Sequence, residues 1–211
     1  MRKHFRYVVY LVVTAFVSSA SAGVYEDFFL AVNRDDGDTV TKLVQRGFDP
    51  NARSPEGQTA LHLALRDQSA RVATALMAER SLDVNLLNAS AESPLMMAAL
   101  RGDLAWSERL MARGAKIHME GWSPLHYAAT GPAPRIVKLL IDRGAPINAL
   151  SPNRSTPLMM AARYGAEASV DLLLARGADK QLRNDLELDA ADFAKLGGRD
   201  FLLGRLAEAK R

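Results

Sequence analysis

The chain has 211 residues, a formal net charge of +3 and no cysteine, which excludes disulfides and a thiol nucleophile. The whole excess of positive charge lies in the segment 1–22, at Arg2, Lys3 and Arg6, where Asp and Glu are absent. Without these three, the 27 Lys and Arg fall to 24 and balance the 24 Asp and Glu. A neutral chain lacks the concentrated cations that nucleic-acid binding needs, so we expect no nucleic-acid partner.

The segment 1–22 is typical of a secretory signal peptide. Basic residues come first, an apolar run extends from Tyr7 to Val17, and small residues end the segment at Ala20-Ser21-Ala22. The run is shorter than the roughly 20 residues that span a bilayer, so we expect cleavage after Ala22 and no membrane insertion afterwards. An exported chain without disulfides suits a bacterial periplasm, and full secretion or a eukaryotic lumen is the alternative location.

The rest of the sequence is periodic. One short motif recurs at 59–64, 93–99, 123–129 and 156–162, and a weaker copy lies at 189–194. A period of roughly 33 residues predicts a stacked solenoid, in which each unit buries its apolar face against its neighbours. In each unit, Ser or Thr, in most copies followed by Pro, predicts the start of one helix. A second, more apolar helix is predicted to end at Gly114, Gly144 or Gly177.

Two motifs in one register identify the family that the chain resembles. The copy beginning at Ser123 reads SPLHYAA, and Arg143-Gly144-Ala145 follows about twenty residues later, as in the ankyrin repeat. The resemblance implies an all-α solenoid of helix-turn-helix units with short finger loops. It implies a domain over 23–211, with an N-terminal cap at about 25–51, repeats at about 55–84, 89–117, 120–147 and 153–180, and a C-terminal cap at 185–211.

The histidines of the repeated motif are the first candidates for chemistry. The resemblance implies that His62 and His126 bond loop backbone, and Met96 and Met159 take the same place in other copies, which favours packing over proton transfer. Ser123 with His126 lacks a third catalytic partner and an oxyanion-hole motif. The sequence also lacks paired metal-ligand spacing and a glycine-rich phosphate loop. We therefore expect no catalysis, no metal and no cofactor.

The family binds partners on a concave face, made by the fingers and the residues after the paired alanines of each motif. Arginine, aromatic and large apolar residues gather at those positions, and arginine and aromatic residues are frequent binding hot spots. The predicted partner-binding groove comprises Arg66, Leu100, Arg101, Met119, Trp122, Arg163 and Tyr164. Solvated helix faces also carry arginines, and Trp122 fits packing as well as binding, so both interpretations stay open.

We therefore expect a monomeric, non-catalytic module that binds another protein. Three roles are compatible with such a module in an exported protein. It could be an accessory or stabilising factor of another periplasmic protein, an immunity protein against a toxin delivered to the periplasm, or a secreted effector acting on host proteins.

Overall fold

The computed structural model describes residues 23–206, so the predicted signal peptide lies outside the described residues. Helices make up all of the regular structure in this range, and an isolated bridge joins Arg53 to Thr59. The all-α prediction is confirmed. The chain forms two compact units, one ending at Leu82 and the other beginning at Asp83.

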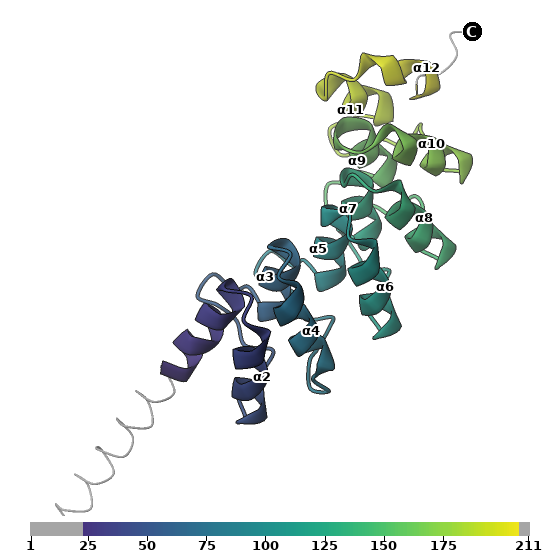
Figure 1. Cartoon of the computed structure of the whole chain (residues 1–211). Helices are drawn as coiled ribbons and strands as arrows, with labels where there is room; N and C mark the ends of the chain where they lie inside the picture. Colours follow the sequence, from purple (N-terminus) through teal and green to yellow (C-terminus); the bar gives the residue numbers. More distant parts are fainter. Residues whose placement is uncertain (1–22, 207–211) are drawn as a thin grey trace, which may run out of the picture. The chain divides into compact units, whose positions relative to one another are not determined.

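The first unit contains two helix pairs. Residues 23–33 form its first helix, followed by α2 (Gly37–Gln45), α3 (Ala60–Arg66) and α4 (Ala70–Ala78) (Figure 1). Phe28, Val40 and Leu76 are fully buried between these helices. Each pair therefore places its apolar stripe inside the unit, as amphipathic helices require.

The second unit repeats the same helix pair three times and ends in a shorter cap. Its elements are α5 (Pro94–Arg101), α6 (Leu104–Ala112), α7 (Pro124–Thr130), α8 (Pro134–Asp142), α9 (Pro157–Tyr164), α10 (Glu167–Ala175), α11 (Ala190–Leu196), the short 3₁₀ helix η1 (Asp200–Leu202) and α12 (Leu203–Leu206). Figure 1 shows α5, α7, α9 and α11 following one another in one layer, and α6, α8 and α10 in a second layer. This in-register stacking confirms the predicted solenoid.

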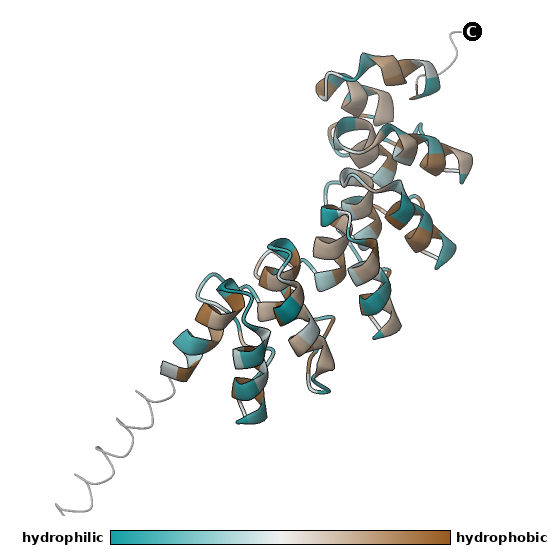
Figure 2. Ribbon diagram, in the orientation of Figure 1, coloured by the Kyte–Doolittle hydropathy of each residue, from teal (hydrophilic) through white to brown (hydrophobic). Residues whose placement is uncertain are grey.

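The second-layer helices are amphipathic. In α8, Ile136, Val137 and Leu140 are buried, whereas Arg135 and Lys138 are exposed. Figure 2 shows hydrophobic and hydrophilic residues on the same helix for α8 and α10. The glycines predicted to end these helices have positive φ, +90° at Gly114 in the case of α6, which confirms the left-handed cap.

The first-layer helices approach one another closely because their facing residues are small. Ala98, Ala128 and Ala161 are completely buried. Gly165, directly after α9, lies so near α7 that a Cβ atom there would be 1.9 Å from the carbonyl oxygen of Ala129. A glycine is required at this position by the close approach of the backbone rather than by its φ of −82°.

The caps of the first-layer helices explain why Met and His alternate in the motif. The amide N–H of Ser93 donates to the Met96 sulfur at 3.2 Å, and the amide of Thr156 donates to the Met159 sulfur at 3.3 Å. In α7, the amide of Ser123 donates to His126 Nδ1 at 3.3 Å. Sulfur and imidazole nitrogen thus satisfy the same backbone donor, which would otherwise be buried without a partner.

Asparagine side chains join the turns of successive repeats. Asn85 Nδ2 donates to the Gly114 carbonyl at 3.0 Å, and Asn85 Oδ1 accepts from the Lys116 amide at 2.7 Å. Asn148 Oδ1 accepts from the Asp179 amide at 2.9 Å in the same way. In the repeat between these two, His118 occupies the position of Asn85 and Asn148. The residue that corresponds to the amide donors Lys116 and Asp179 is Pro146, which has no N–H to donate. Within the described part of the chain, this bridge is therefore missing next to the finger between His118 and Ser123. This finger carries Trp122 and is shorter than the finger between Asn85 and Ser93, so we call it the shortened finger.

Candidate partner-binding site

The second unit contains a pocket of about 270 Å³ where three successive first-layer helices meet the shortened finger. Leu100 comes from α5, Trp122 from the finger, and Met160 from α9, whereas α7 supplies three residues. We call this site the α5–α9 pocket; its lining is Leu100, Trp122, His126, Tyr127, Thr130 and Met160. Two predicted groove residues, Leu100 and Trp122, thus meet in one cavity.

Trp122 forms an aromatic wall with two residues of α7. Its ring centroid lies 5.3 Å from that of His126 and 6.4 Å from that of Tyr127, with interplanar angles of 81° and 86°. Such edge-to-face contacts are the favoured geometry of aromatic pairs. Because the indole is half-buried and also lines the pocket, Trp122 is both a packing residue and part of the candidate surface.

His126 is fully buried and uses both ring nitrogens within the fold. Its Nε2 donates to the Ser155 carbonyl at 3.0 Å, and its Nδ1 accepts from the Ser123 amide at 3.3 Å and the Ser123 hydroxyl at 2.9 Å. Burial lowers the pKa of the imidazole to about 4, against a smaller opposing effect of the Ser155 carbonyl. The ring is therefore neutral near pH 7 and ties two repeats together, as the resemblance implied.

The other two polar side chains that α7 contributes to the lining are also bonded. Tyr127 donates its hydroxyl to Glu92 Oε1 at 2.8 Å, and Asn88 Nδ2 donates to the other carboxylate oxygen at 2.7 Å. Burial, followed by the bond to Glu92, raises the pKa of the Tyr127 hydroxyl. The Thr130 hydroxyl donates to the His126 carbonyl at 2.9 Å. The α7 wall of the pocket consequently presents carbon surface rather than unsatisfied donors and acceptors.

Two predicted arginines and a tyrosine lie on the helix turns that border the pocket. Arg101 follows Leu100 directly, is exposed, and forms no ion pair with any residue between 23 and 206. Arg163 stands one helical turn after Met160, and its guanidinium lies 4.9 Å from the ring centroid of Tyr164, which is 54 % exposed. The two helices that supply Leu100 and Met160 to the apolar pocket therefore also carry cationic and aromatic side chains within one turn of these residues.

Two predicted groove residues, Arg66 and Met119, do not line the α5–α9 pocket. Arg66 belongs to the first unit, and its Nε and terminal nitrogen donate to the two Asp67 carboxylate oxygens at 2.8 Å each. This bidentate bond raises the pKa of the Arg66 guanidinium and compensates its charge locally. Met119 lies half-buried on the same finger as Trp122 but does not line the pocket.

Sequence reasoning did not assign Tyr127 and Met160 to the candidate site. Thr130 follows the paired alanines Ala128 and Ala129 and so lies at a concave-face position, but it was not among the predicted groove residues. A signal was available, because Tyr127 and Met160 occupy the same position of the repeated motif, directly after His126 and Met159. Large side chains at a position that is repeated in neighbouring units converge when the units stack. The alternation of Tyr and Met at this one motif position is therefore the pattern that marks the pocket.

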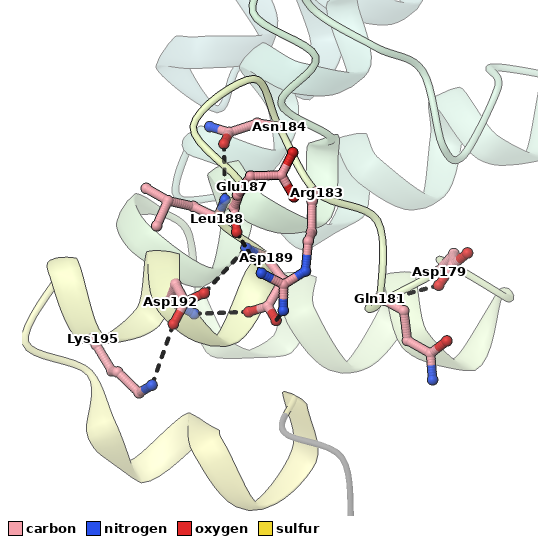
Figure 3. Close-up of polar contacts among 9 residues, drawn as sticks. All are labelled: Asp179, Gln181, Arg183, Asn184, Glu187, Leu188, Asp189, Asp192 and Lys195. Carbon is pink, nitrogen blue, oxygen red and sulfur yellow. Dashed lines mark hydrogen bonds and ion pairs between the residues drawn. The ribbon is translucent and has the colours of Figure 1, made fainter.

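A second, more polar cavity of about 410 Å³ lies between the last fingers and includes Arg154, Arg183 and Glu187. Arg183 donates to the Glu187 carbonyl at 2.6 Å and lies 3.7 Å from an Asp189 carboxylate oxygen (Figure 3). Its charge is thus balanced within its own loop. Residues 23–206 contain no cluster of three or more His, Asp or Glu side chains suited to a metal ion.

Comparison with known proteins agrees with the geometry. A family model described as ankyrin repeats, in three copies, matches residues 28–120 and 95–184. The chain belongs to the ankyrin repeat family. Ankyrin repeats are protein–protein interaction modules, and the family is in general a non-enzymatic scaffold.

Several curated relatives share this architecture over part of their length. The chain is 33 % identical over 154 residues to B-cell lymphoma 3 protein homolog of Mus musculus, covering 70 % of this chain and 34 % of that protein. It is 25 % identical over 159 residues to transient receptor potential cation channel subfamily A member 1 of Homo sapiens, covering 70 % of this chain and 14 % of the channel. It is 32 % identical over 137 residues to ankyrin repeat protein nuc-2 of Neurospora crassa, covering 63 % of this chain and 13 % of that protein. The chain thus spans about a third or less of these relatives.

No helix formed by residues 23–206 combines the length and the apolar character needed to cross a bilayer.

Proposed function

We propose that this ankyrin repeat protein is a non-catalytic binding module of the bacterial periplasm that holds a partner protein against the α5–α9 pocket. The observation that carries the proposal is the convergence of Leu100, Trp122 and Met160 from three repeats on one apolar cavity. An ordered tryptophan beside accessible apolar surface is typical of the centre of a protein interface.

The chemistry of the site favours binding over catalysis. Ser123 and His126 are within hydrogen-bond distance, but both side chains are buried and His126 Nε2 is committed to the Ser155 carbonyl. A general base needs a nitrogen that can reach a substrate proton and a pKa near the working pH. His126 meets neither condition, because its pKa is lowered to about 4.

The location is supported by the composition of the chain. The segment 1–22 has the order of a signal peptide, and the full sequence has no cysteine that would require oxidative folding. In the periplasm the module would act as an accessory or stabilising factor of another protein, with the second unit as its docking surface.

The proposal is tested by crosslinked capture from the periplasm of the producing cell. The test variant replaces Arg101, Trp122 and Arg163 by alanine, and it should lose a partner that the wild-type protein retains. The matched control replaces two exposed arginines at the start and the end of α8 and one exposed aromatic residue by alanine, namely Arg135, Arg143 and Phe201, and should keep the partner. Capture of the same proteins by both variants would refute this placement of the docking surface.

Capture combined with gene deletion and cell fractionation separates the accessory role from the other two roles. An accessory factor should co-purify with a resident periplasmic protein, and deletion should lower the level of that protein in unchallenged cells. An immunity protein would instead leave unchallenged cells healthy and protect them only when a toxin is delivered. Recovery of the chain from the culture medium rather than the periplasm would favour an effector.

A further inference from the structure

We infer that the α5–α9 pocket accepts one large apolar side chain from a partner segment that carries acidic residues on either side of it. This inference rests on the proposed function and specifies the chemistry of the partner. Three observations lead to it: the bonded polar atoms of the lining, the size of the pocket, and the charges at its border.

The lining offers almost nothing that a polar ligand could bond. His126 uses both nitrogens, Tyr127 donates to Glu92, and Thr130 donates to the His126 carbonyl. Polar groups placed in this cavity would lose their water without gaining partners, which is unfavourable. The Trp122 indole N–H has no hydrogen-bond acceptor within residues 23–206, so one donor is left to meet a backbone carbonyl of the bound segment.

The size of the pocket suits one side chain rather than a whole small molecule. Its volume of about 270 Å³ lies just below the lower end, about 300 Å³, of pockets that enclose drug-sized ligands. Interface hot spots, in contrast, are single large side chains that fill such cavities and are shielded by a polar border. A leucine, methionine or phenylalanine would contact Leu100, Trp122 and Met160 together.

The charges at the border select the residues next to that side chain. Arg101 and Arg163 form no ion pair with any residue between 23 and 206. Of the nearby carboxylates, Glu92 accepts hydrogen bonds from Tyr127 and Asn88, whereas Glu120 is exposed on the finger beside Trp122. The two arginines therefore favour Asp or Glu in the bound segment, and Glu120 opposes them.

The test is selection from a display library of random twelve-residue peptides on the purified protein. The enriched peptides should share one large apolar residue with Asp or Glu within a few positions. Trp122→Ala should weaken binding of the consensus peptide by at least about tenfold, which is the loss of a modest hot spot. The pair Arg101→Ala and Arg163→Ala should weaken it and reduce its dependence on salt, because Arg101 is exposed and Arg163 only half-buried, so that salt screens their attraction to the carboxylates of the peptide.

Matched variants keep the result interpretable. Arg135→Ala with Arg143→Ala removes the two arginines that flank α8 and should leave peptide binding unchanged, and Glu120→Gln should tighten it. Thermal unfolding of each variant shows whether a loss of binding reflects a loss of folding, and Leu100→Ala repeats the test if Trp122→Ala unfolds.

Several results would overturn the inference. These are a lack of enrichment, a consensus that is basic or without an apolar residue, or equal binding by folded wild-type and Trp122→Ala proteins. The proposed function can fail separately, since cells could yield no captured partner while the peptide result stands. Conversely, a captured partner with a basic docking segment would refute this inference and leave the proposed function intact.

Discussion

The buried imidazole of His126 should make the stability of the protein depend on pH in a way that one substitution removes. The perturbation is His126→Met, because Met96 and Met159 already fill this place in neighbouring repeats. The sulfur of a methionine at position 126 can accept a hydrogen bond from the Ser123 amide, as the sulfurs of Met96 and Met159 do from the equivalent amides. It cannot donate to the Ser155 carbonyl, but that oxygen also accepts from the Ser151 amide at 3.0 Å. At about pH 7.5 the substitution should therefore cost only about 1 kcal/mol.

The size of the pH effect follows from the difference between the folded and unfolded states. The pKa of His126 is about 4 in the fold against 6.5 for a free imidazole, chiefly because the ring is buried. Between these values the unfolded chain binds a proton that the folded chain does not, so wild-type stability is complete above pH 6.5 and is lost as the pH falls. A difference of about 2.5 pH units at 1.36 kcal/mol each amounts to about 3 kcal/mol.

The assay is urea unfolding of both proteins at several pH values between about 7.5 and 4.5. Titrating carboxylates affect both proteins alike, so the difference between them isolates His126. The variant should be the less stable protein at neutral pH and the more stable one in acid. A matched control, His118→Met, removes an exposed histidine that has no hydrogen bond to any residue in 23–206 and should follow the wild type. Parallel curves for wild type and His126→Met would refute the reasoning.

Three further predictions concern the glycine contact after α9, the asparagine bridge between turns, and the turn at Ala91. Gly165→Ala should destabilise the protein by about 3 kcal/mol in thermal or urea unfolding, because the new Cβ would lie 1.9 Å from the Ala129 carbonyl oxygen. Gly204→Ala is the control: its Cβ meets no atom within 4 Å, so it should be neutral or stabilising, and equal effects of the two substitutions would contradict this account. Asn85→Ala should cost about 1–3 kcal/mol in urea unfolding by leaving two turns unbridged, and Asn85→Asp, which keeps the acceptor, should cost less. Ala91→Gly should stabilise the protein by up to about 1 kcal/mol, because Ala91 has a φ of +59°, a left-handed conformation that costs alanine more than glycine. Ala89→Gly is the control and should destabilise the protein. Melting-temperature shifts of the same sign for both variants would argue against strain at residue 91.

The repeat architecture could be predicted from the sequence because the signals are local and recur. The hydroxyl residue of the motif caps α5 and α9 through Ser93 and Thr156, with proline in the next position. The glycine motif ends each second-layer helix with positive φ, as at Gly144. The shortened finger before Ser123 also has a sequence signal, because the motif copies at Ser93 and Ser123 begin 30 residues apart, whereas those at Ser123 and Thr156 begin 33 apart. Each of these features depends on a few neighbouring residues, so stacking did not alter them.

The candidate site was predicted only in part, because it depends on which side chains converge. Leu100 and Trp122, which motif positions and the finger placed in the predicted groove, line one cavity, and the prediction did not include Tyr127 and Met160, which line it too. The ion pair between Arg66 and Asp67 involves adjacent residues, yet the period alone gave no reason to expect its bidentate geometry.

The sequence by itself determined that this protein is a stack of helix pairs, because an apolar face that recurs at a fixed period can be buried only against the next copy of itself. Only the tertiary structure decided where that stack can hold another molecule. The fold satisfies the hydrogen bonds of His126, Tyr127 and Thr130 and leaves apolar surface where three repeats meet. Arg101 and Arg163, on the helices that supply Leu100 and Met160, form no ion pair with any residue between 23 and 206. Such a cavity depends on packing between residues distant in the chain, which no single repeat specifies.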